Sequence, residues 1–248
     1  MIVVLAVFSA SVSSSELWAQ TTEYERFSVQ MEFGYQVPSL VSNSGEIEMF
    51  HLGRVGAQVG FRGEFWYSGQ RFVFSRVRVG NHRSDDMLGT LTGMLISSDE
   101  ATIIESFGGP IYFNFNQFQA GYGILIKEGK YNHLILSSLG IANLNPAGDF
   151  FWRTKDLNSN YEKIHRLTDF TSDIGWSFDM EYAIKQRVYW TRYGNWEVIA
   201  SIGGNIEKYR VLAKYENLDI LGAFNSRLIQ NEGVLATFRM CFGFRLCF

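Results

Sequence analysis

Hydrophobic and polar residues alternate along much of this chain with a period of two. Such alternation places successive side chains on opposite faces of an extended strand. The C-terminal residues show it most clearly, because every second residue from Val234 to Phe248 is apolar while Arg239 and Arg245 fall on the other face. The pattern predicts a long final strand with one apolar face and one face that carries charge.

The same pattern predicts seven further strands. Their approximate ranges are 27–37, 52–66, 71–82, 117–126, 131–144, 174–185 and 195–208. The alternation fails above Asn116, and either a bulge or an extension beyond a bilayer would explain the break. Residues His133 to Leu136 blur both faces, so the orientation of that strand is left open.

The predicted connections alternate between long and short. Residues 67–70, 127–130 and 186–194 are short, whereas 38–51, 83–110, 145–172 and 209–232 are long. Bacterial transmembrane barrels combine an even strand number with short periplasmic turns and longer outer loops. The pattern therefore predicts that both termini face the periplasm.

Composition narrows the fold class. Apolar residues make up 46% of the chain and charged residues 19%, yet no stretch approaches the roughly 20 consecutive apolar residues of a membrane-spanning helix. Strands in lipid cannot leave a backbone edge unpaired, so they must close. The sequence predicts an all-β fold, an eight-stranded antiparallel up-and-down transmembrane β-barrel. The net charge of −3, without a basic stripe, argues against nucleic acid as a partner.

The N-terminus resembles an export signal. Ile2 to Ala10 is apolar, and a small, polar stretch follows that ends at Ala19-Gln20. This order is typical of a secretory signal peptide, with residues 1–19 removed and residues 20–248 left as a single barrel domain. No Lys or Arg precedes the apolar run, and the alternative is an N-terminal core strand.

The final strand resembles that of the bacterial outer-membrane β-barrels, which alternates in this way and ends in Phe, as Phe248 does here. In length and strand pattern the chain is similar to the small barrels related to the transmembrane domain of outer-membrane protein A, outer-membrane protein X and the PorT-like group. The resemblance implies a bacterial outer-membrane location and outer-membrane lipid as surroundings. It also implies that the insertion machinery reads the C-terminal strand, with Phe244, Leu246 and Phe248 as the signal, and it makes other outer-membrane proteins candidate partners.

The faces opposite the apolar ones carry charges of both signs. The predicted lumen charges are Arg54, Arg62, Arg76, Arg78, Arg239 and Arg245 with Glu32, Glu64, Asp179, Glu181, Glu197 and Glu207. Side chains nearly fill an eight-stranded barrel. A salt-bridged plug is the favoured interpretation, and a gated or selective path is the alternative.

Aromatic side chains gather near the predicted strand ends. Rings of this kind settle at the membrane interface. The residues expected there are Trp66, Tyr67, Trp176, Tyr182, Tyr189, Trp190, Tyr193 and Trp196.

Candidate catalytic groups are sparse. His133 and Ser137 share a strand face, but four residues along a strand span about 13 Å, too far for a nucleophile and its base. The other histidines, His51, His82 and His165, fall in or beside three different predicted loops. Cys241 and Cys247 lie about 20 Å apart on one strand and cannot pair with each other. The sequence thus predicts no catalytic residue, metal site or cofactor.

Two long loops carry unusual apolar content. The segment Asp85–Phe107 is expected to form a lid over the barrel mouth or a protein-contact surface, with Ser98-Asp99-Glu100 capping a short helix. The loop 145–172 holds Phe150, Phe151 and Trp152, which fits recognition or self-packing.

These observations favour a non-enzymatic outer-membrane barrel with a structural or partner-binding role, such as a subunit of a larger outer-membrane complex. The first alternative is a small transport or hydrophobic-ligand-binding barrel. The second is a lipid-modifying outer-membrane enzyme. Fold-level analogy cannot choose among them, because one scaffold carries many functions.

Overall fold

The structure is a computed structural model of the chain, and it describes residues 26–45, 55–83, 101–107, 112–156, 162–191, 194–219 and 224–248. The predicted signal peptide, Arg54, His51, Tyr193 and the capping residues Ser98 to Glu100 lie outside these ranges. The described residues include no helix that is long and apolar enough to cross a membrane.

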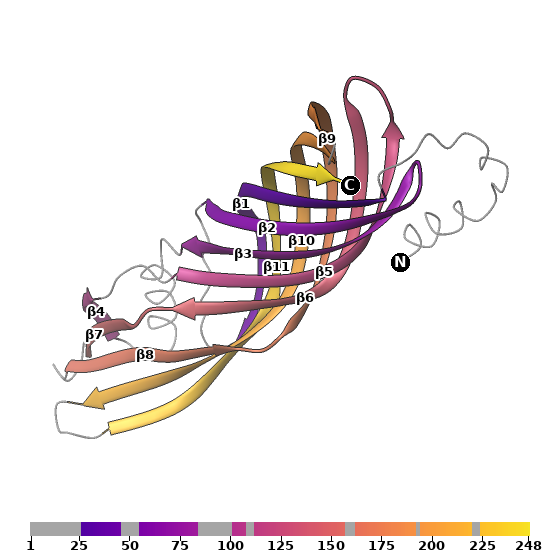
Figure 1. Cartoon of the computed structure of the whole chain (residues 1–248). Coiled ribbons are helices and arrows are strands. Elements are labelled where there is room, and N and C mark those ends of the chain that lie inside the picture. The colour runs from indigo at the N-terminus through magenta and orange to yellow at the C-terminus, as the bar shows by residue number, and fades with distance from the viewer. Residues whose placement is uncertain are drawn as a thin grey trace.

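Eleven β-strands make up most of the described part of the chain (Figure 1). They are β1 (Phe27–Gly45), β2 (Gly56–Ser68), β3 (Arg71–Arg83), β4 (Ala101–Phe107), β5 (Tyr112–Lys127), β6 (Asn132–Ala147), β7 (Phe150–Asp156), β8 (Glu162–Ser172), β9 (Gly175–Thr191), β10 (Gly194–Asp219) and β11 (Phe224–Cys247).

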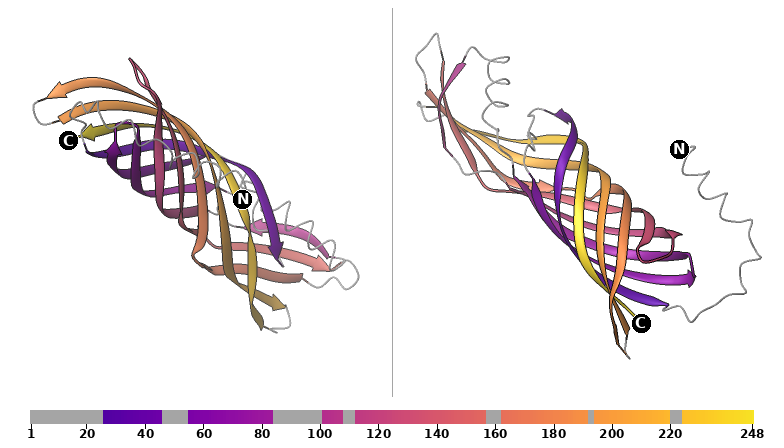
Figure 2. Two further views of the ribbon diagram at one scale, coloured as in Figure 1. Left: turned by 90° about the vertical axis from the view of Figure 1, so that its right-hand side faces the viewer. Right: turned by 90° about the horizontal axis from the view of Figure 1, so that it is seen from above.

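Eight of these strands form a closed antiparallel ring. The order around the ring is β11-β1-β2-β3-β5-β6-β9-β10, and β10 pairs again with β11 to complete it. The first and last strands meet in this closure, because Phe27 and Phe248 exchange backbone hydrogen bonds. Figures 1 and 2 show the strands winding around a common axis. The predicted eight-stranded up-and-down barrel is confirmed.

Three strands lie where the sequence predicted loops. In the hydrogen-bonded order, β8, β7 and β4 follow one another outward from residues 211–219 of β10. The predicted loop 209–232 is also wrong over most of its length, because β10 and β11 continue as a paired ribbon up to Leu218 and Phe224. Together these segments form a projecting sheet beyond one end of the ring, at the lower left of Figure 1. This end is called the upper end of the barrel from here on, and the end with the short turns is called the lower end. A helix capped at Ser98 does not extend into residues 101–107, which are β4.

The outer wall of the ring is apolar. On β11 the outward residues Phe238, Met240, Phe242 and Phe244 are 47–58% exposed. On β10 the exposed apolar positions run from Trp196 to Ile206. That span matches the roughly 9–11 tilted residues with which a strand crosses a bilayer. The ring therefore carries an apolar belt of the height that hydrocarbon requires.

The polarity of the two strand faces inverts where this belt ends. Below the boundary on β5, Phe118 points outward and Gln117 inward, whereas above it Asn114 and Asn116 point outward and Phe115 inward. The pairing of β5 with β3 is continuous through Asn116, so of the two explanations offered for the break, the bulge is absent and the extension is favoured. On β6 the open orientation is also resolved, because Leu134 and Leu136 are buried inside the ring.

Candidate functional site

The ring encloses the predicted charges. The structure describes eleven of the twelve predicted lumen residues, and all eleven are buried, with only 1–4% of their surface exposed. The twelfth, Arg54, lies outside the described residues. The structure thus brings these charges together within the barrel.

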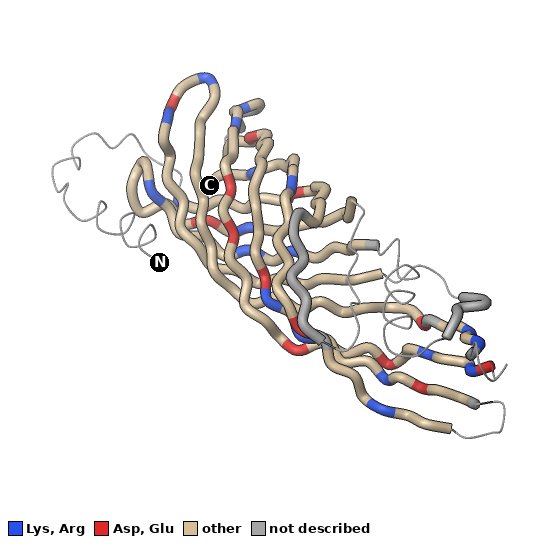
Figure 3. Tube along the Cα trace, turned by 180° about the vertical axis from the view of Figure 1, so that it is seen from behind, with Lys and Arg blue, Asp and Glu red and all other residues tan. Residues whose placement is uncertain are grey.

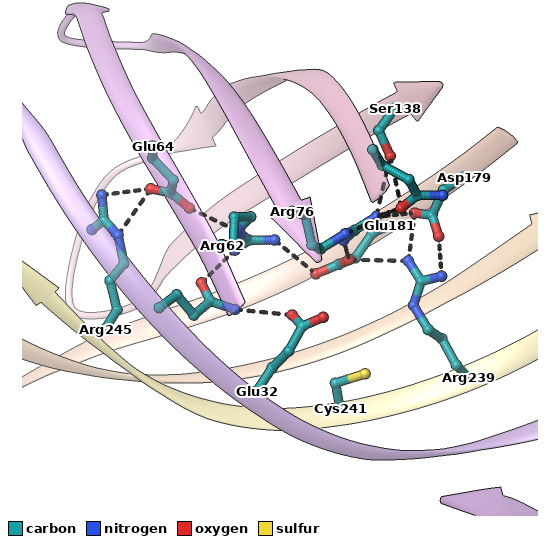
Figure 4. Close-up of polar contacts among 12 residues, drawn as sticks. Glu32, Arg62, Glu64, Arg76, Ser138, Asp179, Glu181, Arg239, Cys241 and Arg245 are labelled. Carbon is teal, nitrogen blue, oxygen red and sulfur yellow. Dashed lines mark hydrogen bonds and ion pairs between the residues drawn. The ribbon is translucent and has the colours of Figure 1, made fainter. Parts of the chain in front are cut away.

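Glu181 on β9 is the hub of the network. Its carboxylate accepts hydrogen bonds from Arg62 at 3.2 Å, from Arg76 at 2.6 Å and from Arg78 at 3.0 Å. Arg239 on β11 donates a fourth at 3.1 Å. Figure 4 shows Arg62, Arg76 and Arg239 converging on this carboxylate from β2, β3 and β11.

Asp179, two residues before Glu181, is a second carboxylate that contacts three of the same arginines. It lies 3.0 Å from Arg76 and 2.8 Å from Arg78, and it accepts two hydrogen bonds from Arg239. Glu32 on β1 accepts a hydrogen bond from Arg78 at 2.7 Å. Each guanidinium at this level therefore faces at least one carboxylate.

The network crosses the whole lumen. In the ring, three strands separate β2 from β9 on either side, so these two strands lie opposite each other. The ion pair between Arg62 on β2 and Glu181 on β9 at 3.2 Å therefore joins opposite walls. This side-chain bridge spans the lumen at that level, and it favours the plug interpretation over the path.

A second group of charges lies nearer the chain ends. Arg245 on β11 contacts Glu64 at 2.8 Å and also pairs with Glu197 on β10. Lys185 on β9 lies 3.5 Å from Glu197. Lys185 is buried and has the same parity as Glu181, so the alternation along β9 is the signal that could have added it to the predicted lumen charges.

An apolar floor closes the lumen below these charges. It consists of Trp66, Phe72, Phe74, Leu125, Leu134, Leu136, Ala183 and Ile199. Trp66 stacks on Phe72 with ring centroids 4.3 Å apart. The cations of Lys185 and Arg245 lie 4.6 and 5.3 Å from the Trp66 ring centroid. Gly123 makes the floor possible, because a Cβ there would collide with the Phe72 ring.

The expectation that Trp66 lies at the membrane interface is therefore wrong. Its side chain is 6% exposed and points into the lumen, in phase with Glu64. Tyr67, Trp176, Tyr182 and Trp196 do lie exposed on the outer wall, with 37–49% exposure. Tyr189 and Trp190 belong to β9, but their side chains are outside the described part.

Glu207 stands apart from the ion pairs. Its carboxylate accepts hydrogen bonds from Gln117 at 2.7 Å and from Asn205 at 3.2 Å, and no described cation pairs with it. The balance of buried charge nevertheless closes across the described residues. Six buried cations equal six buried acids in number, namely Arg62, Arg76, Arg78, Lys185, Arg239 and Arg245 with Glu32, Glu64, Asp179, Glu181, Glu197 and Glu207.

A second apolar cluster lies where the ring continues into the projecting sheet. It contains Phe113, Phe115, Leu144, Trp152, Leu167, Tyr209, Val211, Ala213, Ile229 and Leu235. Trp152, predicted for recognition or self-packing, packs inward and stacks on His165 at 5.0 Å. The filled lumen is thus layered: an apolar floor, a charged middle and an apolar upper part.

The outer face of the projecting sheet is polar and carries ion pairs. Lys208 pairs with Glu232 at 3.7 Å and Arg210 with Asp173 at 3.2 Å, just above the apolar belt. Higher up, Lys214 lies 2.6 Å from Glu216, and its hydrogen bond to that carboxylate raises the pKa of the lysine. A charged outer face fits water and headgroups, whereas the wall below it fits hydrocarbon.

The structure does not assemble the candidate chemical groups into a site. Nδ1 of His133 lies 2.5 Å from the Tyr182 hydroxyl, while Ser137 pairs in register with Met180. His82 contacts Gln36, and His165 contacts Thr154 and Tyr215. The described residues contain no cluster of three or more His, Cys, Asp or Glu placed to hold a metal ion. Cys241 and Cys247 form no disulfide with each other, as their spacing predicted, and both are buried.

The C-terminal strand lies in the ring wall. Phe244 and Phe248 are 57% and 55% exposed on its outer face, and Leu246 lies between them opposite Val29. Their role as an insertion signal stays a prediction.

Comparison with known proteins gives matches in structure alone. No protein-family model matches the chain, and no curated protein is similar to it in sequence. The outer membrane protein OprG from Pseudomonas aeruginosa matches with 11% identity and a TM-score of 0.49, over 91% of this chain and 96% of that one. A major outer membrane protein from Thermus thermophilus matches with 11% identity and a TM-score of 0.38, over 86% and 99%. The outer membrane protease OmpT from Escherichia coli matches with 7% identity and a TM-score of 0.39, over 93% and 99%.

The ring order, the apolar outer belt and the filled polar interior together establish the architecture from the chain's own geometry. The chain is an eight-stranded antiparallel up-and-down β-barrel with the build of a small transmembrane barrel.

Proposed function

We propose that this chain is a non-conducting, non-enzymatic bacterial outer-membrane barrel that acts through its projecting sheet in a structural or partner-binding role. The observation that carries the proposal is the Arg62–Glu181 bridge between opposite walls of the ring. Charges neutralised in this way fill a narrow interior while satisfying one another. A barrel filled by such a network serves as a membrane anchor. The parts of the chain outside the membrane then carry out its function.

The outer wall supports the membrane location. Exposed Phe, Val, Ile and Met side chains surround the ring, and the charged pair Lys208–Glu232 marks the upper edge of this belt. The short turns lie at the opposite edge together with Phe27 and Phe248, where the first and last strands meet. In bacterial barrels that edge is periplasmic, so the projecting sheet faces the cell exterior.

The tip of the projecting sheet supports a partner-binding role. Ile164 on β8, Leu218 on β10 and Phe224 on β11 pair directly in register and form a row on the outer face. Their side chains are 43–57% exposed. Apolar side chains grouped in water above a belt of ion pairs are typical of protein contact surfaces. Another outer-membrane or cell-surface protein is the partner that such a row fits.

Two measurements test this proposal. The purified barrel in planar bilayers is expected to give no steady single-channel current, and a sustained large conductance would contradict the closed lumen. Tagged protein extracted in mild detergent is expected to retain a partner at fixed stoichiometry. The double variant L218S/F224S should lose that partner, whereas K155Q/K163Q, changed on the neighbouring β7 and β8, should keep it.

A second candidate function is binding of an apolar ligand at the upper end. The specific observation that favours it is the apolar inner lining there, with Phe113, Phe115, Trp152 and Leu167 each 0–2% exposed. Titration of the protein with an apolar fluorophore distinguishes the two candidates. Saturable binding that is lost in Trp152→Ala would favour the ligand, and its absence would favour the anchor.

A further inference from the structure

Asparagine side chains cluster on the outer face of the barrel, just above the apolar belt. They lie on three adjacent strands, β3, β5 and β6, and backbone pairing places them in two rows. The upper row consists of Asn81, Asn114 and Asn145, and the lower row of Asn116 and Asn143. These five residues are called the amide patch here.

Amides are unusual at these positions. Asn is depleted in β-strands. On β10, in contrast, the outward residues above the belt are Lys208 and Arg210, and both form ion pairs. Figure 3 shows charged residues along the projecting sheet, whereas the upper stretches of β3 and β5 are drawn in tan. The patch therefore differs from the charged outer face beside it.

The amides of the patch can accept a ligand. Asn81, Asn114 and Asn116 are exposed, and no hydrogen bond within the described part of the chain engages their amide groups. The Ser172 hydroxyl lies 2.8 Å from Oδ1 of Asn143 and 3.0 Å from Oδ1 of Asn145. Each amide carries one acceptor oxygen and two N–H donors. The patch thus presents donors and acceptors about 5 Å apart from strand to strand.

The patch borders the apolar wall directly. On β5 the outward residue below Asn116 is Phe118. On β6 the one below Asn143 is Ile141, which pairs in register with Phe118. These two side chains are 52% and 49% exposed, and Tyr112, 44% exposed, lies at the opposite border of the patch. A lipid with its chains on the wall and its headgroup at the amides would contact both surfaces, which a ligand dissolved in water would not.

The side chains of the patch indicate the chemistry of that headgroup. A sugar hydroxyl donates and accepts hydrogen bonds as an amide does, so a row of amides can engage a row of hydroxyls. Tyr beside Ser and Asn combines rigid ring area with adaptable hydrogen bonding. Phosphate is recognised mainly by Arg and Lys, whereas the five amides, Tyr112 and Ser172 carry no formal charge.

We propose that the amide patch binds the sugar headgroup of a glycolipid whose acyl chains lie on the apolar wall below it. This inference rests on the proposed membrane location and adds a lipid class to it. The glycolipid would belong to the leaflet at the upper edge of the apolar belt.

The test uses the full barrel in phosphatidylcholine nanodiscs that also hold equal amounts of phosphatidylglycerol and a galactosyl diacylglycerol with the same acyl chains. Native mass spectrometry after release identifies and counts the lipids that stay bound. The wild-type chain should retain the galactolipid in excess over phosphatidylglycerol. The variant N81A/N114A removes two exposed amides from the upper row. It should lower that excess about fivefold or more, because each net hydrogen bond contributes a factor of roughly 2–10.

The matched control is N217A/N225A, which removes two amides that pair in register near the tip of the projecting sheet. It should retain the wild-type preference, and heat-dependent gel migration verifies that both variants fold. Absence of a galactolipid excess in the wild type, an unchanged excess in N81A/N114A or an equal loss in the control would overturn the inference. Phosphatidylglycerol that is retained in excess and lost in N81A/N114A would also overturn it, since phosphate would then be the ligand. Failure of the folded wild-type chain to enter the bilayer would instead overturn the location on which the inference rests.

Discussion

Replacing Glu181 with Gln tests whether the charged layer holds the barrel together. The change preserves the size of the side chain but removes one negative charge from a carboxylate that lies 2.6–3.2 Å from four guanidinium groups. Asp179 and Glu64 would remain as partners for those arginines. The buried layer would nevertheless carry one uncompensated positive charge. The NH2 group of the new amide would also face the N–H donors of the arginines.

The expected cost follows from that imbalance. Removing one partner of a buried ion pair destabilises a protein by about 3–5 kcal/mol, because the remaining charge stays buried without compensation. Glu207→Gln is the matched control. Glu207 accepts two amide hydrogen bonds and pairs with no described cation, so the same isosteric change should alter the unfolding free energy by no more than about 1 kcal/mol.

Reversible unfolding in urea, with the protein in phospholipid vesicles, measures both variants against the wild type. Tryptophan fluorescence and the heat-dependent gel migration of the folded barrel report the same transition. A loss of several kcal/mol in Glu181→Gln beside a near-neutral Glu207→Gln supports the charged layer as the main stabilising element of the lumen. Equal effects in the two variants would refute the reasoning, since both carboxylates are buried and only their cationic partners differ.

Four further substitutions probe the floor and the wall. Trp66→Ala should cost about 3–5 kcal/mol of unfolding free energy, measured in the same urea titration, because it empties the floor of the lumen. Gly123→Val should cost about 1–3 kcal/mol in that assay by displacing the Phe72 ring, and a neutral result would contradict the close approach. Met240→Arg on the lipid face should lower the unfolding free energy in vesicles by about 2–4 kcal/mol, whereas Leu212→Arg above the belt should lower it by about 0–1 kcal/mol. Equal losses in the two variants would show that the membrane boundary does not lie between these residues.

The strands that cross the belt could be predicted from sequence because their two faces meet different solvents. Phe238 to Phe248 and Phe27 to Val37 face lipid at every second position, and the intervening residues face a charged lumen. The residues of the charge network could be predicted from the same alternation of side chains between the two faces. Residue parity alone assigned Glu181 and Arg62 to the interior, although their direct contact across the diameter required the closed ring.

The predictions that were wrong concern segments in which side chains still alternate between the two faces of a strand, but the surroundings of each face change. Trp66 looked like an interface residue because it is aromatic and lies near a turn, yet its phase with Glu64 places it inside. The upper part of β10 was predicted as a loop, and most of its outward residues, Lys208, Arg210, Lys214 and Glu216, are charged. Charge on the outward face merely shows that water has replaced lipid there.

The inversion of face polarity is therefore itself a signal that a sequence can carry. On β10 the outward residues change from Ile206 to Lys208, while the inward ones change from Glu207 to Tyr209 and then Val211. A face that is apolar in lipid becomes polar in water, and the opposite face must then supply the core, because a sheet needs one apolar side in either solvent. The same exchange occurs on β5 at Asn116. Strands that exchange faces in this way mark the membrane boundary more sharply than their aromatic residues do, as the buried Trp66 demonstrates.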